Sequence, residues 1–278
     1  MTSWQMPRRA LALPAFWFAL TISTISTIPT INVQAQSKND PDPHRGAPLN
    51  AFSLDYEYED FDRNVESWQL LSAELSHRFG FGSVIARVND AERFGSHGDQ
   101  IELDAYPHLG KGTYAYLNVG HSNDGIFPKW RGGAEIYRNL PHSFEASVGF
   151  RRLLFSSSDV TLYTGSVGKY KGNYWISLRP YISSDNSGTS ASGTITLRRY
   201  YVDADQYIGF DVGYGEGAAP DVTQQEITRL RNWSARVSTH WKVRPTVVLL
   251  GRIGYRDQEF QFAKRKSVYA GFGIEKRF

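Results

Sequence analysis

Hydrophobic and polar positions alternate over many short segments of this chain, and the alternation is clearest in the last one. Residues 267–278 (SVYAGFGIEKRF) place apolar side chains on one face, namely Val268, Ala270, Phe272 and Ile274. A period of two predicts a β-strand. The strand ends on Phe278, in phase with the apolar face. An aromatic end of this kind is typical of bacterial outer-membrane barrels, whose insertion machinery recognises it, so Phe278 is predicted to be a C-terminal insertion signal.

Similar alternation recurs from Leu49 onward, with no convincing helical period between the segments. The pattern predicts about 14 strands, with 12 as the alternative count. They are expected at residues 51–59, 68–79, 82–94, 100–106, 113–121, 130–138, 143–153, 160–168, 174–182, 193–201, 206–214, 230–241, 246–256 and 267–278.

The connections between these segments also follow a pattern. Those after even-numbered segments are short and rich in turn residues, as at residues 80–81 and 139–142. Most of those after odd-numbered segments are longer, and loops are expected at 122–129, 183–192, 215–229 and 257–266. An outer-membrane barrel has short periplasmic turns and longer external loops. The fold class predicted is therefore all-β, an antiparallel up-and-down transmembrane β-barrel, in preference to a soluble β-sandwich.

Composition is compatible with this prediction. The 278 residues include no cysteine, carry a net charge of +3 and are 14% aromatic. The mean hydropathy of -0.43 excludes a helical membrane protein but not a barrel, whose strands are half polar. Arg8 and Arg9 precede an apolar stretch that ends in Val33-Gln34-Ala35, which indicates a signal peptide. The expected organisation is a signal peptide over 1–35, a flexible periplasmic lead-in over 36–48 and the barrel over 49–278, in the outer membrane of a Gram-negative bacterium.

Two stretches then suggest a family. Residues 130–153 (WRGGAEIYRNLPHSFEASVGFRRL), with their Asn-Leu-Pro turn, and residues 160–182 (VTLYTGSVGKYKGNYWISLRPYI) resemble YaiO-type outer-membrane β-barrels, as does the Phe278 end. The resemblance implies location and architecture, and it supplies no catalytic residues. Some similar barrels follow helical repeat domains or accompany polysaccharide machinery, whereas only a short tail precedes the barrel here.

The polar face of the predicted strands is the candidate functional surface. Its charges are unevenly distributed along the chain, acidic first and basic later. The candidate lumen residues are Glu57, Glu74, Glu102, Asp104, Glu135, Glu145, Arg151, Arg179, Arg198, Arg236, Arg252 and Arg256. Two interpretations remain open: a transverse field that selects polar or charged solutes in a narrow pore, or opposite walls that pair across the lumen and plug it.

Aromatic side chains are also predicted on the inner face. They are Tyr114, Tyr116, Trp175, Tyr181 and Tyr200. Rings with polar tips suit contact with sugar chains, and the alternative is that they simply fill the lumen.

The sequence offers little for catalysis. A hydrolase would need a serine, a histidine and a carboxylate together, and only His97 and His121 lie on the loop side. We therefore expect a non-enzymatic narrow pore or a barrel associated with envelope or polysaccharide export, without cofactor or metal. A hydrolase or lipid-modifying enzyme at the extracellular rim is the alternative. The expected partners are outer-membrane lipid, the barrel-insertion machinery and polysaccharide or small polar solutes, with no nucleic acid, and the protein is expected to be a monomer.

Overall fold

The computed structural model describes residues 49–63, 65–93, 95–185, 188–203, 205–216, 231–260 and 264–278. The expected signal peptide and lead-in, residues 1–48, lie outside this part of the chain. Fourteen strands are described, the number expected. The first seven are β1 (Asn50–Phe61), β2 (Trp68–Phe79), β3 (Gly82–Arg93), β4 (Ser96–Gly110), β5 (Thr113–His121), β6 (Trp130–Leu140) and β7 (Phe144–Leu154). The others are β8 (Asp159–Lys171), β9 (Tyr174–Asp185), β10 (Gly188–Tyr200), β11 (Tyr207–Gly215), β12 (Arg231–Arg244), β13 (Val247–Glu259) and β14 (Lys264–Arg277).

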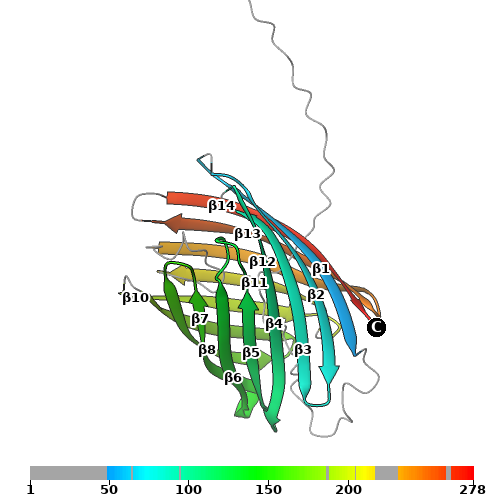
Figure 1. The fold of residues 1–278 in the computed structure, drawn as a ribbon. Helices are drawn as coiled ribbons and strands as arrows, with labels where there is room; N and C mark the ends of the chain where they lie inside the picture. Colours follow the sequence, from blue (N-terminus) through cyan, green and yellow to red (C-terminus); the bar gives the residue numbers. More distant parts are fainter. Residues whose placement is uncertain are drawn as a thin grey trace, which may run out of the picture.

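Each strand pairs with its sequence neighbours, and β14 returns to pair with β1, so the sheet is a closed antiparallel barrel (Figure 1). At the closing edge the backbone N–H of Asn50 donates to the carbonyl of Phe278 at 3.0 Å, and the N–H of Phe278 donates back to Asn50 at 2.9 Å. Closure leaves no strand edge unpaired, which is what a sheet in a bilayer requires, since lipid offers no hydrogen bonds to exposed backbone.

The alternation seen in the sequence becomes an inner and an outer face. Large apolar side chains of the outer face are exposed, such as Ile101 at 66% and Val148 at 70%, whereas charged residues on the inner face, such as Glu102, are buried. An exposed apolar belt of this kind is stable in lipid and not in water. Within the described residues no helix is long and apolar enough to cross a membrane.

Large aromatic side chains at strand ends mark the edges of this belt. Trp130, Trp233, Trp241 and Phe278 are all exposed on the outer face. Tryptophan and other aromatic side chains are favoured at the membrane–water interface because one end of the ring system is apolar and the other tolerates water.

The connections separate the two ends of the barrel. The turns on the side of the chain termini are short, as at Gly80-Phe81 between β2 and β3, and β6 joins β7 through a single 3-10 turn, Pro141–Ser143. The expected loops at 183–192 and 257–266 are wrong in extent, because strand pairing continues to Asp185 with Gly188 and to Glu259 with Lys264. Residues 122–129 do form a longer connection, between β5 and β6. The side of the termini is assigned to the periplasm by the general rule for these barrels.

Candidate functional site on the inner wall

The strand register places every candidate lumen residue on the inner face. Glu57, Glu102, Asp104, Glu135, Glu145, Arg151, Arg198 and Arg252 are buried there. Glu74, Arg179, Arg236 and Arg256 are on the same face by register, opposite Arg87, Thr194, Asp211 and Ser267 respectively.

Arg87 is the centre of one charged cluster. Its side chain pairs with Glu74 on the preceding strand through Nε, and its Nη2 lies 3.1 Å from Asp104 on the following strand. Asn118 donates to Glu102 at 3.2 Å and to Asp104 at 2.6 Å. A buried charge is tolerated only when it is paired and hydrogen-bonded, and this cluster meets that condition with side chains from β2 to β5.

A second cluster surrounds Glu135 on β6. Arg179 Nη1 lies 2.6 Å from Glu135 Oε1, and its Nη2 donates to the Tyr137 hydroxyl at 3.2 Å. Arg151 Nη2 lies 3.6 Å from the other carboxylate oxygen, and Ser147 donates to Glu135 at 2.6 Å. One carboxylate therefore binds arginines from β7 and β9.

A third cluster lies where the first and last strands meet. Arg252 on β13 reaches past β14 to β1, where its Nη2 is 2.9 Å from Asp55 and its Nε pairs with Glu57. Four residues further along β13, Arg256 Nη1 lies 2.7 Å from Glu59. We call these contacts the seam cluster, since they connect the strands on either side of the closing strand.

The ion pairs of the inner wall thus join strands that are one to three positions apart around the barrel. Acidic residues are concentrated on the early strands and arginines on the later ones, as the sequence predicts. The idea that these charges are held by pairing across the lumen is wrong for these clusters, because their partners are neighbours along the wall.

Glycines on the inner face explain how bulky side chains lie along the wall. A Cβ added at Gly254 would meet the Tyr269 ring at 2.3 Å, and one added at Gly168 would meet Trp175 Nε1 at 2.8 Å. A Cβ at Gly120 would meet Arg131 Cγ at 2.8 Å. Each glycine therefore leaves space on one strand for a large side chain of the next strand to lie over it.

The inner face carries a band of aromatic side chains towards the periplasmic end. By register it includes four of the five predicted residues, Tyr114, Tyr116, Trp175 and Tyr200, together with Tyr106, Tyr137, Tyr170 and Tyr207. Tyr181 is also on the inner face but lies nearer the extracellular end, opposite Thr164. Tyr114 stacks on Tyr137 with ring centroids 4.7 Å apart. The guanidinium of Arg198 lies 5.0 Å from the Trp175 ring centroid and 4.7 Å from that of Tyr207, which is cation–π geometry.

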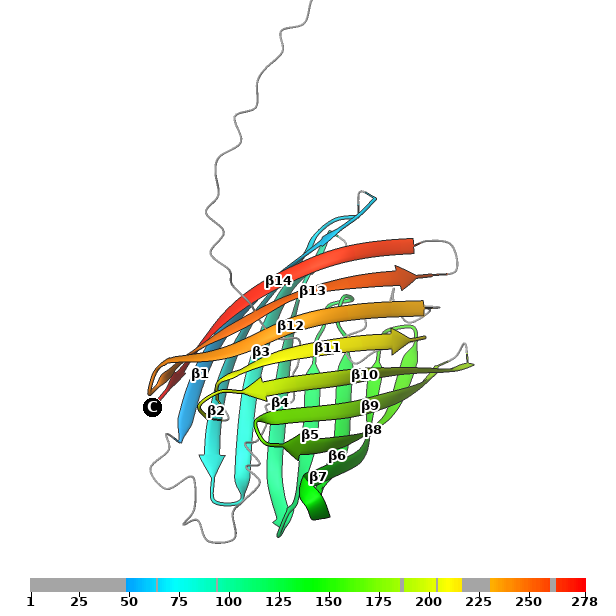
Figure 2. The same ribbon diagram turned by 180° about the vertical axis from the view of Figure 1, so that it is seen from behind.

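Strands β9 to β12 form one wall of the barrel, seen in Figure 2. Its central inward positions are mostly small: Ser177, Thr194, Thr196, Gly209, Gly213, Ser234 and Ser238. The opposite wall, β2 to β6, carries the Arg87 and Glu135 clusters instead. The β2–β6 wall is therefore bulkier than the central part of the β9–β12 wall, and we call it the bulky wall.

The connection between β5 and β6 folds inward at the extracellular end. Ile126 and Phe127 are 4% and 9% exposed and pack with Ala91 and Leu70 of the inner wall. Asp124 Oδ2 accepts from the backbone N–H of Asp99 at 2.8 Å. Residues 122–129, which we call the inward loop, thus narrow the mouth of the barrel on the side of the bulky wall.

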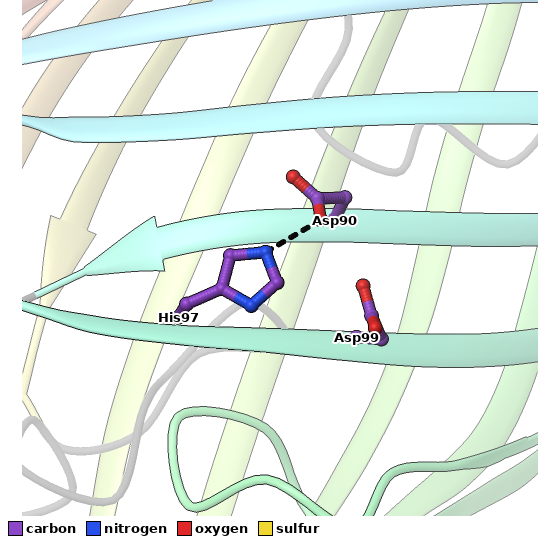
Figure 3. A group of neighbouring side chains, drawn as sticks. All are labelled: Asp90, His97 and Asp99. Carbon is purple, nitrogen blue, oxygen red and sulfur yellow. Dashed lines mark hydrogen bonds and ion pairs between the residues drawn. The ribbon is translucent and has the colours of Figure 1, made fainter.

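The two loop-side histidines are held by groups other than serine. His97 Nε2 lies 2.7 Å from Asp90 Oδ2, with Asp99 beside them, on the outer face at the tip of the β3–β4 hairpin (Figure 3). His121 Nδ1 lies 2.7 Å from the Lys129 carbonyl, and its ring packs on Trp130. The structure thus does not bring the two histidines into a shared site.

Sequence reasoning missed the inward loop and the glycine spaces. The loop carries an apolar Ile126-Phe127-Pro128 step within an otherwise polar stretch, which is a usable signal for burial. The glycines could be assigned to the inner face by parity, but the partner that covers each one depends on register between strands, which the sequence of a single strand does not contain.

A closed 14-strand barrel with an exposed apolar belt and a charged inner wall is a transmembrane β-barrel of the bacterial outer membrane. Residues 49–220 match the family described as the YaiO membrane beta barrel domain, and the chain belongs to this family. The family resemblance predicted from the sequence is confirmed, and the family places the protein in the outer membrane of a Gram-negative cell.

Solved structures with TM-scores above 0.5 show the same fold at low identity. The CymD monoaromatic hydrocarbon channel aligns with a TM-score of 0.55 and 7% identity, over 84% of this chain and 89% of that one. A bacterial polysaccharide outer membrane secretin gives a TM-score of 0.55 and 7% identity, over 84% and 99%. Omp33 of Acinetobacter baumannii gives 0.48 and 15% identity, over 84% and 100%. No curated protein matches the sequence.

Proposed function

We propose that this protein is a narrow, water-filled pore that passes small polar solutes across the outer membrane as a monomer and catalyses no reaction. One observation carries the proposal. Charged side chains in the middle of the inner wall remain in contact with solvent: Glu74, Arg179 and Arg236 are 30%, 17% and 18% exposed. A lumen filled by its own side chains would leave no such exposure.

The arrangement of the large inner side chains supports the same conclusion. Tyr269, Trp175 and Arg131 lie over glycines of adjacent strands, and the charged clusters pair with neighbours along the wall, which favours an open centre. A barrel of this strand number is intermediate between the eight-stranded type that side chains fill and the 16–18-stranded porins with wide channels. The inward loop narrows the mouth further, which suits small solutes.

Export of a polysaccharide through the barrel is a second candidate. The aromatic band on the inner wall favours it, because ring faces and phenolic hydroxyls suit contact with sugars. One solved barrel with this fold is named as a polysaccharide secretin. That name describes the other protein. For this chain, the proposal of polysaccharide export rests only on the aromatic side chains of the inner wall.

Conductance in a planar bilayer tests the pore. The purified barrel, shown to be folded by its faster migration in an unboiled gel, should give steady single-channel steps. R236Q removes a solvent-exposed inner charge and should shift the reversal potential in a salt gradient towards cations. R199Q removes a charge from the outer face of β10 and is the matched control. A folded protein that gives no steps would reject the pore.

A further inference from the structure

We infer that the inner wall formed by β9 to β12 binds linear oligosaccharides that carry carboxylates. The inference rests on the proposed pore and names the class of solute that its wall would recognise. It is carried by the placement of three arginines, by the small side chains around them and by the aromatic rings next to them.

The three arginines form a ladder along the pore. Arg198 lies in a register row with Trp175, Gly209 and Ser238. Arg236 lies in the next row towards the outside, with Ser177, Thr196 and Asp211, and Arg179 lies in the row after that, with Thr194, Gly213 and Ser234. Rows two residues apart are separated by about 6.6 Å along a strand. Each row of this wall therefore contributes one arginine, from β10, β12 and β9 in turn. The Arg179 guanidinium reaches sideways to Glu135 of β6, so it lies at the edge of the wall, whereas Arg198 and Arg236 lie within it.

Small neighbours give a solute access to this arginine ladder. Arg198 faces Gly209 across the β10–β11 pair, and Arg179 faces Thr194 across the β9–β10 pair. Arg236 donates from Nε to Asp211 at 2.9 Å, and its side chain is still 18% exposed, so solvent reaches it. An arginine presents five N–H donors in a planar fork that matches a carboxylate, so one protein partner does not exhaust its capacity.

The charge of this wall favours anions. Between the rims its inward ionisable groups include Arg198, Arg236 and one carboxylate, Asp211, while the charge of Arg179 at the edge is balanced by Glu135 of β6. The β1–β4 side instead carries a concentration of carboxylates, among them Asp55, Glu57, Glu59 and Asp104. A polyanion would be attracted to the first wall and repelled from the second, which directs it to the side where side chains are small.

Aromatic rings on the same wall extend the chemistry from simple anions to sugars. Trp175 and Tyr200 are half-buried, and Tyr207 lies next to them, with the Tyr200 and Tyr207 ring centroids 5.7 Å apart. Flat apolar faces beside hydroxyls from serine and threonine suit pyranose rings, which have an apolar face and a polar rim. Guanidinium, ring and hydroxyl together match a uronic acid unit better than chloride or phosphate.

The test uses oligouronates of two to six units as the probe and malto-oligosaccharides of the same length as the neutral match. Added to open single channels, the oligouronates should block the current at a concentration at least about tenfold lower. R198Q, R236Q and R179Q should each raise the half-blocking concentration about tenfold, the effect of one charge-assisted hydrogen bond. R199Q, on the outer face of the same strand as Arg198, should leave it unchanged.

Further variants separate charge from shape and folding. R198K retains the charge without the planar fork and should fall between wild type and R198Q. W175A should weaken the block and Y174A, its outward-facing neighbour, should not. Equal block by charged and neutral sugars, or full competition by phosphate at equal concentration, would overturn the inference while the pore stands. If the folded barrel gives no channels, oligouronate binding is measured by calorimetry in detergent. Binding that is weakened by R198Q but not by R199Q would support the site and reject the pore. No binding would reject both.

Discussion

Arg252 and Asp55 form a buried ion pair, with Nη2 2.9 Å from Oδ1, although the two residues lie near opposite ends of the barrel sequence. Arg252 is 0% exposed, and it also pairs with Glu57. The contact passes the inner face of β14 at Gly271 and Gly273, where no side chain intervenes. The barrel is thus closed by side chains as well as by the backbone hydrogen bonds between β1 and β14.

The seam cluster makes a prediction about unfolding. Replacing both partners with amides, D55N/E57Q, leaves the Arg252 guanidinium buried without a countercharge. We expect the free energy of unfolding to fall by about 3–5 kcal/mol, measured by urea titration of the folded barrel in detergent. The triple variant R252M/D55N/E57Q removes the charge as well and should recover most of this loss.

A surface ion pair provides the control for the seam variants. Arg152 and Asp159 lie 3.0 Å apart on the outer side, with side chains 58% and 49% exposed. R152Q should change the free energy of unfolding by no more than about 1 kcal/mol. If R152Q and D55N/E57Q lowered the free energy of unfolding equally, burial would not explain the contribution of the seam cluster to stability.

A substitution at Gly273 tests whether the seam cluster needs the space that this glycine leaves beside Asp55. A Cβ at this position would lie 2.5 Å from Asp55 Oδ2 and 3.0 Å from Leu250 Cδ1. G273V should therefore displace the Asp55 carboxylate and lower the urea midpoint, with a cost of about 1–3 kcal/mol typical of overpacking. The outward-facing G251V, on the neighbouring strand, is the comparison, and an equal effect there would point to strand propensity instead.

The inward loop predicts a change in conductance. I126S/F127S removes the apolar side chains that pack on Ala91 and Leu70, and truncating a buried phenylalanine costs about 3–5 kcal/mol. The loop should then leave the wall, and the single-channel conductance of the open pore should rise. N123S, at an exposed position of the same loop, is the control.

Gly98 gives an independent route to the same outcome. A Cβ there would meet Asp124 Cβ at 2.6 Å and Ile126 Cγ1 at 2.9 Å. G98V leaves the loop sequence intact but removes the space beneath it, so conductance should again rise. Unchanged conductance in both variants would show that the loop does not limit flow.

His97 gives a prediction about pH. It lies at the hairpin tip, outside the apolar belt, where the hydrogen bond and charge of Asp90 raise the pKa of its imidazole, with smaller contributions from Asp99 and Asp124. The usual value is about 6.5. Because the folded-state pKa is raised, the stabilisation from the pair is present below the usual value and is lost as pH rises through the raised one.

NMR titration of the His97 imidazole measures this shift. D90N should return the pKa towards its usual value, and D99N should lower it less, because Asp90 is the hydrogen-bonded partner. Equal shifts in the two variants would contradict the geometry of the pair.

The strand pattern was sufficient to predict the fold because lipid favours apolar side chains and the lumen favours polar ones, and the two alternate along each strand. Val148 and Glu135 are assigned to the correct faces by parity alone. Strand ends were harder to predict: the β9–β10 hairpin continues to Asp185 and Gly188 through Ser, Gly and Thr residues that resemble a loop in composition. Beyond the membrane the outer face of a strand no longer needs apolar side chains. Backbone pairing can therefore continue there without the alternation that marks a strand in the sequence.

The sequence predicted which residues line the inner face, but it did not predict which of them form ion pairs with each other. The sequence shows acidic and basic residues on separate strands, which suggested walls that oppose each other. Which carboxylate meets Arg179 depends on the reach of its side chain across β8 and β7 to Glu135, and therefore on glycines and serines between them. That information is distributed over several strands and appears only once their register is fixed.

In the proposed pore, the small side chains of β9 to β12 and the bulky lining of β2 to β6 place the passage off the barrel axis. A solute that crosses the pore would contact the four strands β9 to β12, while the wall of β2 to β6 would stabilise the barrel without contacting the solute. Permeability and mechanical strength are then encoded in different stretches of the gene, so either can drift during evolution, or be re-engineered, without disturbing the other.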